Sequence, residues 1–147
     1  MSTLEEFRDR QTELRDIIGE LKAMMIPEQL QIKPNAKTCY EHICKLGDKM
    51  KQHMAEEGKG VYPPLLIHED PKLKSLAWGF INGEKPLRKQ FESYYKKWLK
   101  DCDFNFTPEF MEESHNLFEA IEDRIDREQH VLLPRLEESG VFSGVHQ

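Results

Sequence analysis

The chain has 147 residues, of which 38% are hydrophobic and 33% are charged, and its net charge is −6. This length suits one domain, so we expect a single domain over residues 1–147. The negative charge argues against a nucleic-acid partner, because phosphate binding needs clustered Lys and Arg. No apolar stretch approaches the ~20 residues of a membrane span, and the charged start is unlike a secretory signal. We therefore expect a cytoplasmic protein without membrane contact.

The cysteines, Cys39, Cys44 and Cys102, form an odd set without a CxxC spacing. This pattern argues against a disulfide framework and against a thiolate zinc site. We expect reduced, partly buried thiols, and nothing in their spacing supports a redox role.

The first two predicted helices each begin with a capping box. The first begins with the capping box Ser2-x-x-Glu5 and ends before Pro27, and the second begins with a capping box at Thr38. The second is expected to end at residues 58–60, which read Gly-Lys-Gly. In both helices apolar residues recur at the spacing of one helix face, so each has a side to bury.

The third and fourth predicted helices begin at Asp70-Pro71 and Thr107-Pro108, where an N-cap precedes proline at the first helical position. The range Gly83–Pro86 should kink or break the third helix, because proline lacks a backbone donor and clashes with the preceding turn. Pro134 closes the fourth. Period-two alternation is missing and the connections are short, which predicts an all-α, up-down-up-down antiparallel four-helix bundle.

An internal repeat relates the second helix to the fourth. The range His53–Pro63 aligns without gaps with the range Arg124–Pro134, and Glu57 falls on Glu128. An apolar pair precedes the proline of each copy. The two helices should therefore end alike, as expected of a duplicated helix hairpin.

Polar residues interrupt the apolar face of every predicted helix: Gln11, His53, Glu57, Glu84, Arg124 and Glu128. Buried ionisable groups are costly unless they are paired or bound to a cation. Separate salt bridges at the helix ends are one interpretation, but the distribution over all the helices favours a shared buried site. His53-x-x-x-Glu57 places an imidazole and a carboxylate on one helix face, where both can hold the same ion.

These motifs carry a resemblance. His53-x-x-x-Glu57 running into Val61-Tyr62-Pro63, and Glu128 running into Leu132-Leu133-Pro134, resemble the hemerythrin-like cation-binding (HHE) domain family. The resemblance implies a four-helix bundle around a non-haem diiron centre, and a function in binding oxygen or in sensing oxygen, iron or nitrogen oxides. In that family, helices one and three each supply a histidine, and helices two and four each supply His-x-x-x-Glu.

The chain departs from the family pattern at several ligand positions. The positions that keep their residues are His53, Glu57 and Glu128. Gln11 stands where helix one would supply histidine, and Glu84, or alternatively Lys85, stands at the position on helix three. Arg124 takes the histidine position on helix four. Because a guanidinium has no lone pair to give, we expect Arg124 to replace a ligand and to pair with the carboxylates.

This reading predicts a non-enzymatic hemerythrin-like protein with an incomplete diiron site and a regulatory or interaction function. We expect a protein partner, and a monomer or a small homo-oligomer. The cofactor would be none, or a single iron or other divalent metal ion. No Gly-rich phosphate loop, nucleophile elbow or spaced zinc motif supports an enzyme.

Two alternatives remain open. The first is a protein that binds or senses one metal ion, held by His53, Glu57 and Glu128. Gln11 would then add a weak oxygen ligand. The second is a histidine phosphotransfer domain that uses His42, because residues 42–47 resemble a His-x-x-Lys-Gly motif with one residue inserted.

Overall fold

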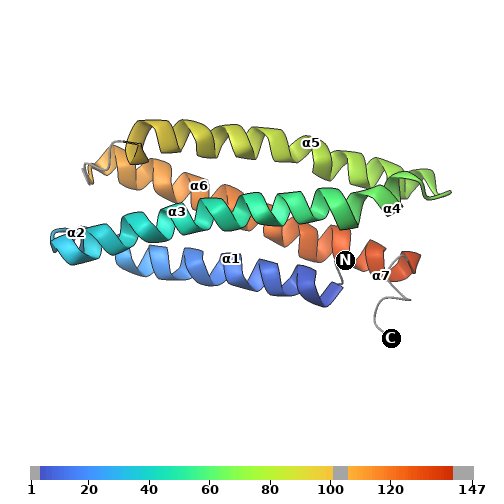
Figure 1. Cartoon of the computed structure of the whole chain (residues 1–147), viewed down its shortest axis with the longest axis horizontal. Helices are drawn as coiled ribbons and strands as arrows, with labels where there is room; N and C mark the ends of the chain where they lie inside the picture. The colour runs from blue at the N-terminus through green and yellow to red at the C-terminus, as the bar shows by residue number, and fades with distance from the viewer. Residues whose placement is uncertain (1–3, 101–105, 141–147) are drawn as a thin grey trace.

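The computed structural model describes residues 4–100 and 106–140. Long helices form its body: α1 (Leu4–Met24), α3 (Lys33–Glu56), α5 (Pro71–Tyr94) and α6 (Pro108–Arg127). They lie side by side along the long axis, and each runs opposite to the next in the chain (Figure 1). Helix α1 packs against α3 and α6, and α5 packs against the same two helices. The predicted all-α antiparallel bundle is confirmed, and the described residues contain no strand.

Short elements join or extend the long helices. They are α2 (Pro27–Leu30), α4 (Tyr62–Leu66), α7 (Leu133–Ser139) and the π-helical segments η1 (Glu57–Val61), η2 (Tyr95–Leu99) and η3 (Glu128–Leu132). Among the described residues, no helix is both long enough and apolar enough to cross a membrane.

The predicted starts of the third and fourth helices are confirmed by their N-caps. The Asp70 carboxylate accepts a hydrogen bond of 2.9 Å from the backbone N–H of Lys72. The Thr107 hydroxyl accepts one of 3.1 Å from the backbone N–H of Phe110. A proline follows each cap, in the first turn, where a helix needs no backbone donor.

The predicted start of the second helix is wrong. Helix α3 already begins at Lys33, so Thr38 lies inside it and its hydroxyl donates to the carbonyl of Pro34 at 2.9 Å. Pro34 is compatible with this earlier start because it lies in the first turn. The predicted capping box at Ser2 lies outside the described residues.

The predicted interruption of the third helix is not a break, because α5 runs through Pro86 to Tyr94 as one helix. Pro86 cannot donate to the carbonyl of Asn82, but both residues are exposed, so water can satisfy that carbonyl. Beyond the proline, the buried side chains of Leu87 and Phe91 hold the helix against the core. Burial of this face therefore outweighs the lost backbone hydrogen bond.

The predicted ends of the second and fourth helices are not ends either. The chain passes from α3 through η1 into α4, and from α6 through η3 into α7. The backbone N–H of Tyr62 donates to the carbonyl of Glu57, and that of Leu133 donates to the carbonyl of Glu128. In each copy of the repeat, the residue that donates this π-type bond directly precedes the proline. A π-turn contains one residue more than an α-turn. The two copies of the repeat therefore share this form.

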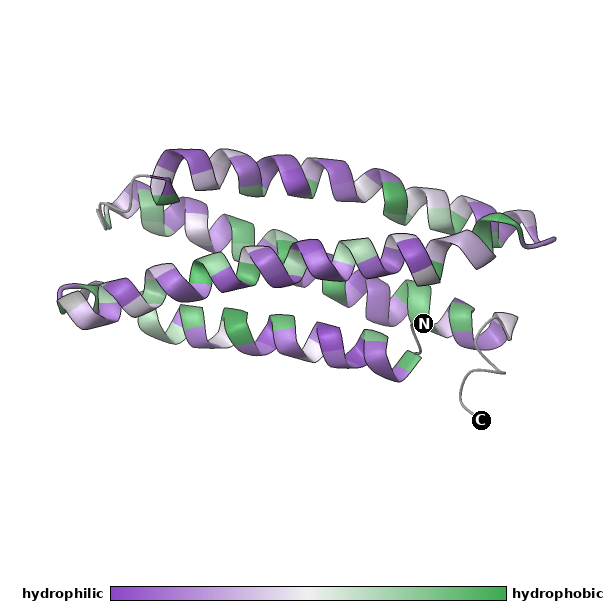
Figure 2. Ribbon diagram, viewed as in Figure 1, coloured by the Kyte–Doolittle hydropathy of each residue, from purple (hydrophilic) through white to green (hydrophobic). Residues whose placement is uncertain are grey.

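Apolar side chains form two clusters along the bundle. The first includes Leu14 and Leu117, and the second includes Phe7 and Leu132. In Figure 2 hydrophobic residues recur among hydrophilic ones along the helices, as an amphipathic bundle requires. On α1 and α5 the polar core residues, Gln11 and Glu84, fall between residues of the two clusters, and Glu57 and Glu128 do so where α3 passes into η1 and α6 into η3.

Helices α3 and α5 approach each other closely at Gly47. A Cβ atom built on Gly47 would lie only 2.1 Å from the Cζ atom of the Phe91 ring. The ring of Phe91 therefore occupies the space that any larger residue at position 47 would need.

Cys39, one of the described cysteines, is a free thiol. Cys39 is buried, and burial raises the pKa of its thiol to about 12, so it stays protonated and unreactive. Cys44 is partly buried. Cys102 lies outside the described residues.

Candidate metal centre

The six polar residues predicted on the apolar faces come together in the interior of the bundle. Their exposed fractions are Gln11 0%, His53 3%, Glu57 0%, Glu84 7%, Arg124 4% and Glu128 0%. On α5, Glu84 faces this cluster and Lys85 is exposed, which decides between the two alternatives for the third helix.

His53 lies between two glutamates that come from the two copies of the repeat. Its Nε2 atom is 2.9 Å from Oε1 of Glu128 and 3.4 Å from Oε1 of Glu57. The ring of His53 packs on Phe7, with 5.2 Å between the ring centroids. Each glutamate is the first residue of a π-helical segment, so the helix is wider at the positions that face His53.

Arg124 occupies the centre of the carboxylate group. Its Nε atom is 3.3 Å from Glu128, and its Nη2 atom is 3.4 Å from Glu84 and 3.6 Å from Glu57. Its Nη1 atom donates to the backbone carbonyl of Phe80 at 3.0 Å. The guanidinium thus faces three buried glutamates, and a backbone carbonyl fixes its orientation.

Tyr62 belongs to the same network, although the sequence did not indicate it. Its hydroxyl donates to Oε2 of Glu57 at 2.7 Å and accepts a hydrogen bond from Nη2 of Arg124 at 2.7 Å. In an α-helix Val61 would lie one turn beyond Glu57, but the π-turn of η1 puts Tyr62 there instead. In the sequence, the only sign of this role is that a tyrosine occupies one position of the apolar pair before the repeat proline.

Gln11 lies in the cluster but presents the wrong atom for a ligand. Its amide Nε2 donates to Oε1 of Glu128 at 3.1 Å, whereas its amide oxygen accepts from Gln129 at 3.3 Å. The predicted oxygen ligand is therefore turned away from the site, because Glu128 takes up the amide donor.

The glutamates of the site hold their protons more tightly than usual. Burial, reinforced by the charge of Glu128, raises the pKa of Glu57 to about 8. Burial also raises the pKa of Glu84 and that of Glu128. At neutral pH Glu57 therefore carries a proton, which its contact with Arg124 does not prevent.

The pKa values of the two basic residues of the site, His53 and Arg124, are shifted in opposite directions. Burial lowers the pKa of His53, so its imidazole is neutral at neutral pH. Burial alone would lower the pKa of Arg124, but the surrounding carboxylates, first of them Glu57, raise it. The permanent cation of the cluster is therefore the arginine.

The donor set fits one divalent cation. One ligand atom from each of His53, Glu57 and Glu128 lies within 4.8 Å of the other two. Glu57 Oε1 is buried without a hydrogen-bond partner, and Glu128 Oε2 has only the ion pair with Nε of Arg124 at 3.3 Å. Such incomplete pairing is costly for buried carboxylate oxygens. One imidazole and two carboxylates suit iron, manganese or zinc, and a cation there would satisfy these oxygens.

The same residues do not fit two cations. Arg124 stands where a second ion would need a ligand, and its fixed positive charge lies within 3.6 Å of three carboxylates that would have to bind it. Gln11 and Glu84 replace the histidines of the other helices. The diiron centre implied by the resemblance therefore lacks its second half.

His42, the residue of the phosphotransfer alternative, lies on α3 away from this cluster. Its Nδ1–H donates to the carbonyl of Thr38 at 3.0 Å, and its Nε2 atom is 2.9 Å from a carboxylate oxygen of Glu20. Both ring nitrogens are engaged, and a carboxylate stands where a phosphoryl group would arrive.

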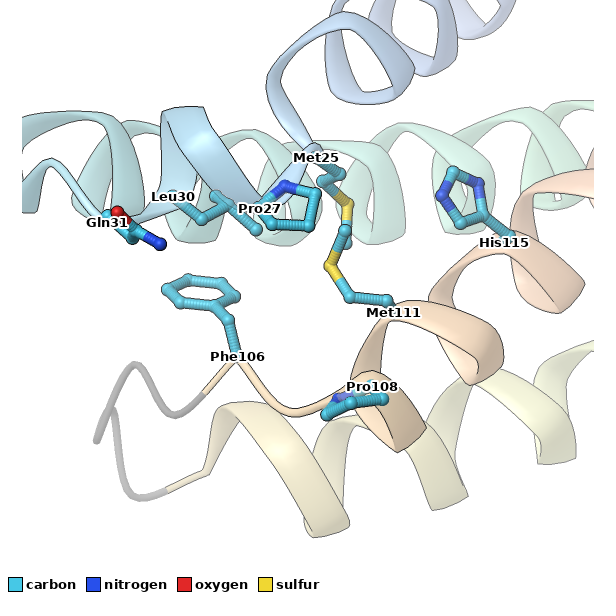
Figure 3. Close-up of a pocket in the computed structure, with 8 residues that line it drawn as sticks. All are labelled: Met25, Pro27, Leu30, Gln31, Phe106, Pro108, Met111 and His115. Carbon is cyan, nitrogen blue, oxygen red and sulfur yellow. The ribbon is translucent and has the colours of Figure 1, made fainter.

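A separate pocket of about 680 Å³ lies where α1 ends and α6 begins. In Figure 3 the side chains of Met25 and Met111 point toward one another inside it, and Phe106 faces Leu30 across it. His115 lines the pocket and its ring packs edge-on against Phe118. None of the predicted site residues lines this pocket.

The fold and the site define a class of protein: a helical bundle with a buried histidine–carboxylate group suited to a cation. A family model described as the hemerythrin HHE cation binding domain matches residues 2–136, so the chain belongs to the hemerythrin family. This match confirms the resemblance and gives no support to a phosphotransfer domain. No curated protein and no solved structure matches the chain.

Proposed function

We propose that this chain is a non-enzymatic hemerythrin-like domain that binds one divalent cation through His53, Glu57 and Glu128. The observation that carries the proposal is the position of Arg124 among the carboxylates. The three glutamates carry −3 when ionised and Arg124 carries +1, so the cluster sums to −2. One divalent cation neutralises the cluster, whereas two would leave excess positive charge in an apolar core.

Burial of the site supports the absence of catalysis. The site residues are at most 7% exposed, and α1 covers the histidine, so a substrate would have no direct access. Catalysis at a metal needs an open coordination position that a substrate can reach. We therefore propose that the domain acts as a regulator, in which the cation changes the bundle and a protein partner reads that change.

Calorimetric titration with Mn²⁺ and Zn²⁺, and with Fe²⁺ under anaerobic conditions, tests the proposal on chelator-treated protein. The expected result is one cation per chain, lost in His53→Ala and in Glu128→Gln. His42→Ala is the matched control, because His42 lies on the same helix and bonds to Thr38 and Glu20 instead. Two cations per chain would contradict the role given to Arg124.

A second candidate function is a metal-free interaction domain. It is favoured by the same ion pairs, because Arg124 already supplies a positive charge to Glu57, Glu84 and Glu128. Protein that binds no cation at millimolar concentration, and still unfolds cooperatively, would decide for this candidate.

A further inference from the structure

Arg10 of α1 contacts the side of His53 that faces away from the glutamates. Its Nε–H donates to Nδ1 of His53 at 3.3 Å. An arginine side chain has only donors and does not lose its proton in proteins. Nδ1 must therefore be an acceptor without a proton of its own.

This contact determines where the imidazole proton lies. A neutral imidazole has one N–H, so when Nδ1 accepts, the proton is on Nε2. That Nε2 atom is 2.9 Å from Oε1 of Glu128, the distance of a hydrogen bond from imidazole to carboxylate. The doubly protonated imidazolium is also excluded, since its Nδ1–H would point at the N–H of Arg10.

We propose that Arg10 is a positioning residue that holds His53 as the Nε2–H tautomer and so keeps the centre closed to a cation. A cation at Nε2 requires that nitrogen to give up its proton, which then resides on Nδ1. Nδ1–H cannot accept from Arg10, so cation binding and the bond from Arg10 exclude each other. Histidines that bind metals normally donate their other N–H to an acceptor, and here that position holds a donor.

A second chain of hydrogen bonds starts at an arginine of α1, and in it too each group donates to the next one toward Glu128. Arg15 donates to the amide oxygen of Gln129 at 3.0 Å, so the amide nitrogen of Gln129 is free to donate. It donates to the amide oxygen of Gln11 at 3.3 Å, and Gln11 in turn donates to Glu128 at 3.1 Å. Both arginines thus direct donors toward the same carboxylate oxygen.

The position of Arg10 is suited to a reversible closure. Its guanidinium carbon lies 5.8 Å from the centroid of the Phe7 ring, and its Nη2 atom is buried without a hydrogen-bond partner. An unsatisfied donor recovers hydrogen bonds when it moves into water, which offsets the loss of the bond to His53. Cation binding would therefore release Arg10 and change the surface of α1. This inference rests on the proposed function, and it names the residue that regulates the site.

Nuclear magnetic resonance of cation-free protein labelled with ¹⁵N in histidine reads the tautomer directly. We expect Nδ1 of His53 without a proton and Nε2 with one. Arg10→Glu places a carboxylate oxygen at the same number of bonds from the backbone as the Arg Nε atom, so Nδ1 should become protonated. A protonated Nδ1 in the unmodified chain, or a bare Nδ1 in the variant, would overturn the proposal.

The affinity for Zn²⁺ gives the second readout. Arg10→Glu should bind at least about tenfold more tightly than Arg8→Glu, the gain expected from removing one opposed hydrogen bond. Arg8 is the matched control, because it makes the same change of charge on the same helix but contacts Glu137. Equal affinities would overturn the gating of the site. If no variant binds Zn²⁺ while the tautomers are as expected, the proposed function fails and the relation between Arg10 and His53 stands.

Discussion

The guanidinium of Arg124 donates a hydrogen bond of 2.7 Å to the hydroxyl of Tyr62. The same hydroxyl donates to Glu57 at 2.7 Å, so it bridges the two side chains, whose own nearest polar atoms are 3.6 Å apart. A bridging hydroxyl allows both groups to remain hydrogen-bonded in an apolar interior. Tyr62 is thus part of what makes the cluster stable without a cation.

Tyr62→Phe removes this bridge and little else. A donor of Arg124 and an acceptor of Glu57 would lose their best partner while remaining buried, so we expect a loss of about 1–3 kcal/mol in the free energy of unfolding. Urea titration of cation-free protein measures the loss. Tyr95→Phe is the control, because Tyr95 is 42% exposed, and its cost should stay below about 0.5 kcal/mol. Equal costs for the two variants would place the Tyr62 hydroxyl outside the network.

Arg124→Met keeps much of the side-chain volume but removes the charge from the carboxylate group. Breaking a buried ion pair leaves uncompensated charge, so the cation-free protein should lose about 3 kcal/mol or more of stability. Arg127→Met tests the same change at an exposed position on α6, where we expect less than about 0.5 kcal/mol. Chemical denaturation of both variants would reveal the difference. A small loss at position 124 would mean that the glutamates are satisfied by protonation alone.

Stability should fall as the pH rises from 6.5 to about 8. The pKa of Glu57 is raised from 4.5 to about 8 by burial, so across this window the folded chain holds a proton that the unfolded chain has released. Raising the pH then favours the unfolded state. His53, with a lowered pKa, acts in the opposite direction only below its ordinary value of 6.5. Burial raises the pKa of Glu84 and Glu128 as well, so their titration acts in the same direction as that of Glu57.

The measurement is the free energy of unfolding of cation-free protein at several pH values in this window. Glu57→Gln keeps the shape of the side chain but cannot titrate, so its profile should be flatter than that of the unmodified chain. A stability that rises between pH 6.5 and 8 would show that Glu57 is ionised in the folded protein.

The polar cluster could be predicted from the sequence because helical spacing identifies the residues on an apolar face. His53 and Glu57 are one turn apart, and an internal repeat adds Glu128 to the same site. Such patterns report which side chain faces inward. They placed Glu84 in line with Leu87 and Phe91 and left Lys85 as the alternative, and the structure buries Glu84.

Tyr62 and Arg10 could not be predicted, for different reasons. The π-turn of η1 shifts the register by one residue, and α-helical spacing therefore selects Val61 instead of Tyr62. Arg10 lies on the edge of the apolar face, and only the position of the His53 ring shows that it touches Nδ1. Register shifts and the orientation of a ring depend on tertiary packing, which periodicity does not contain.

Gly47→Ala tests the close approach of α3 and α5. The added methyl group would meet the Phe91 ring at 2.1 Å, so the ring or a helix must move, and we expect a loss of about 1–3 kcal/mol. Gly19→Ala is the matched control, because a Cβ at Gly19 has no neighbour within 4 Å and alanine favours the helix by about 0.5–1 kcal/mol. Urea unfolding should therefore give opposite signs for the two substitutions. Stabilisation by both would mean that the Phe91 ring moves aside at no cost, and that Gly47 is not needed for the packing of these helices.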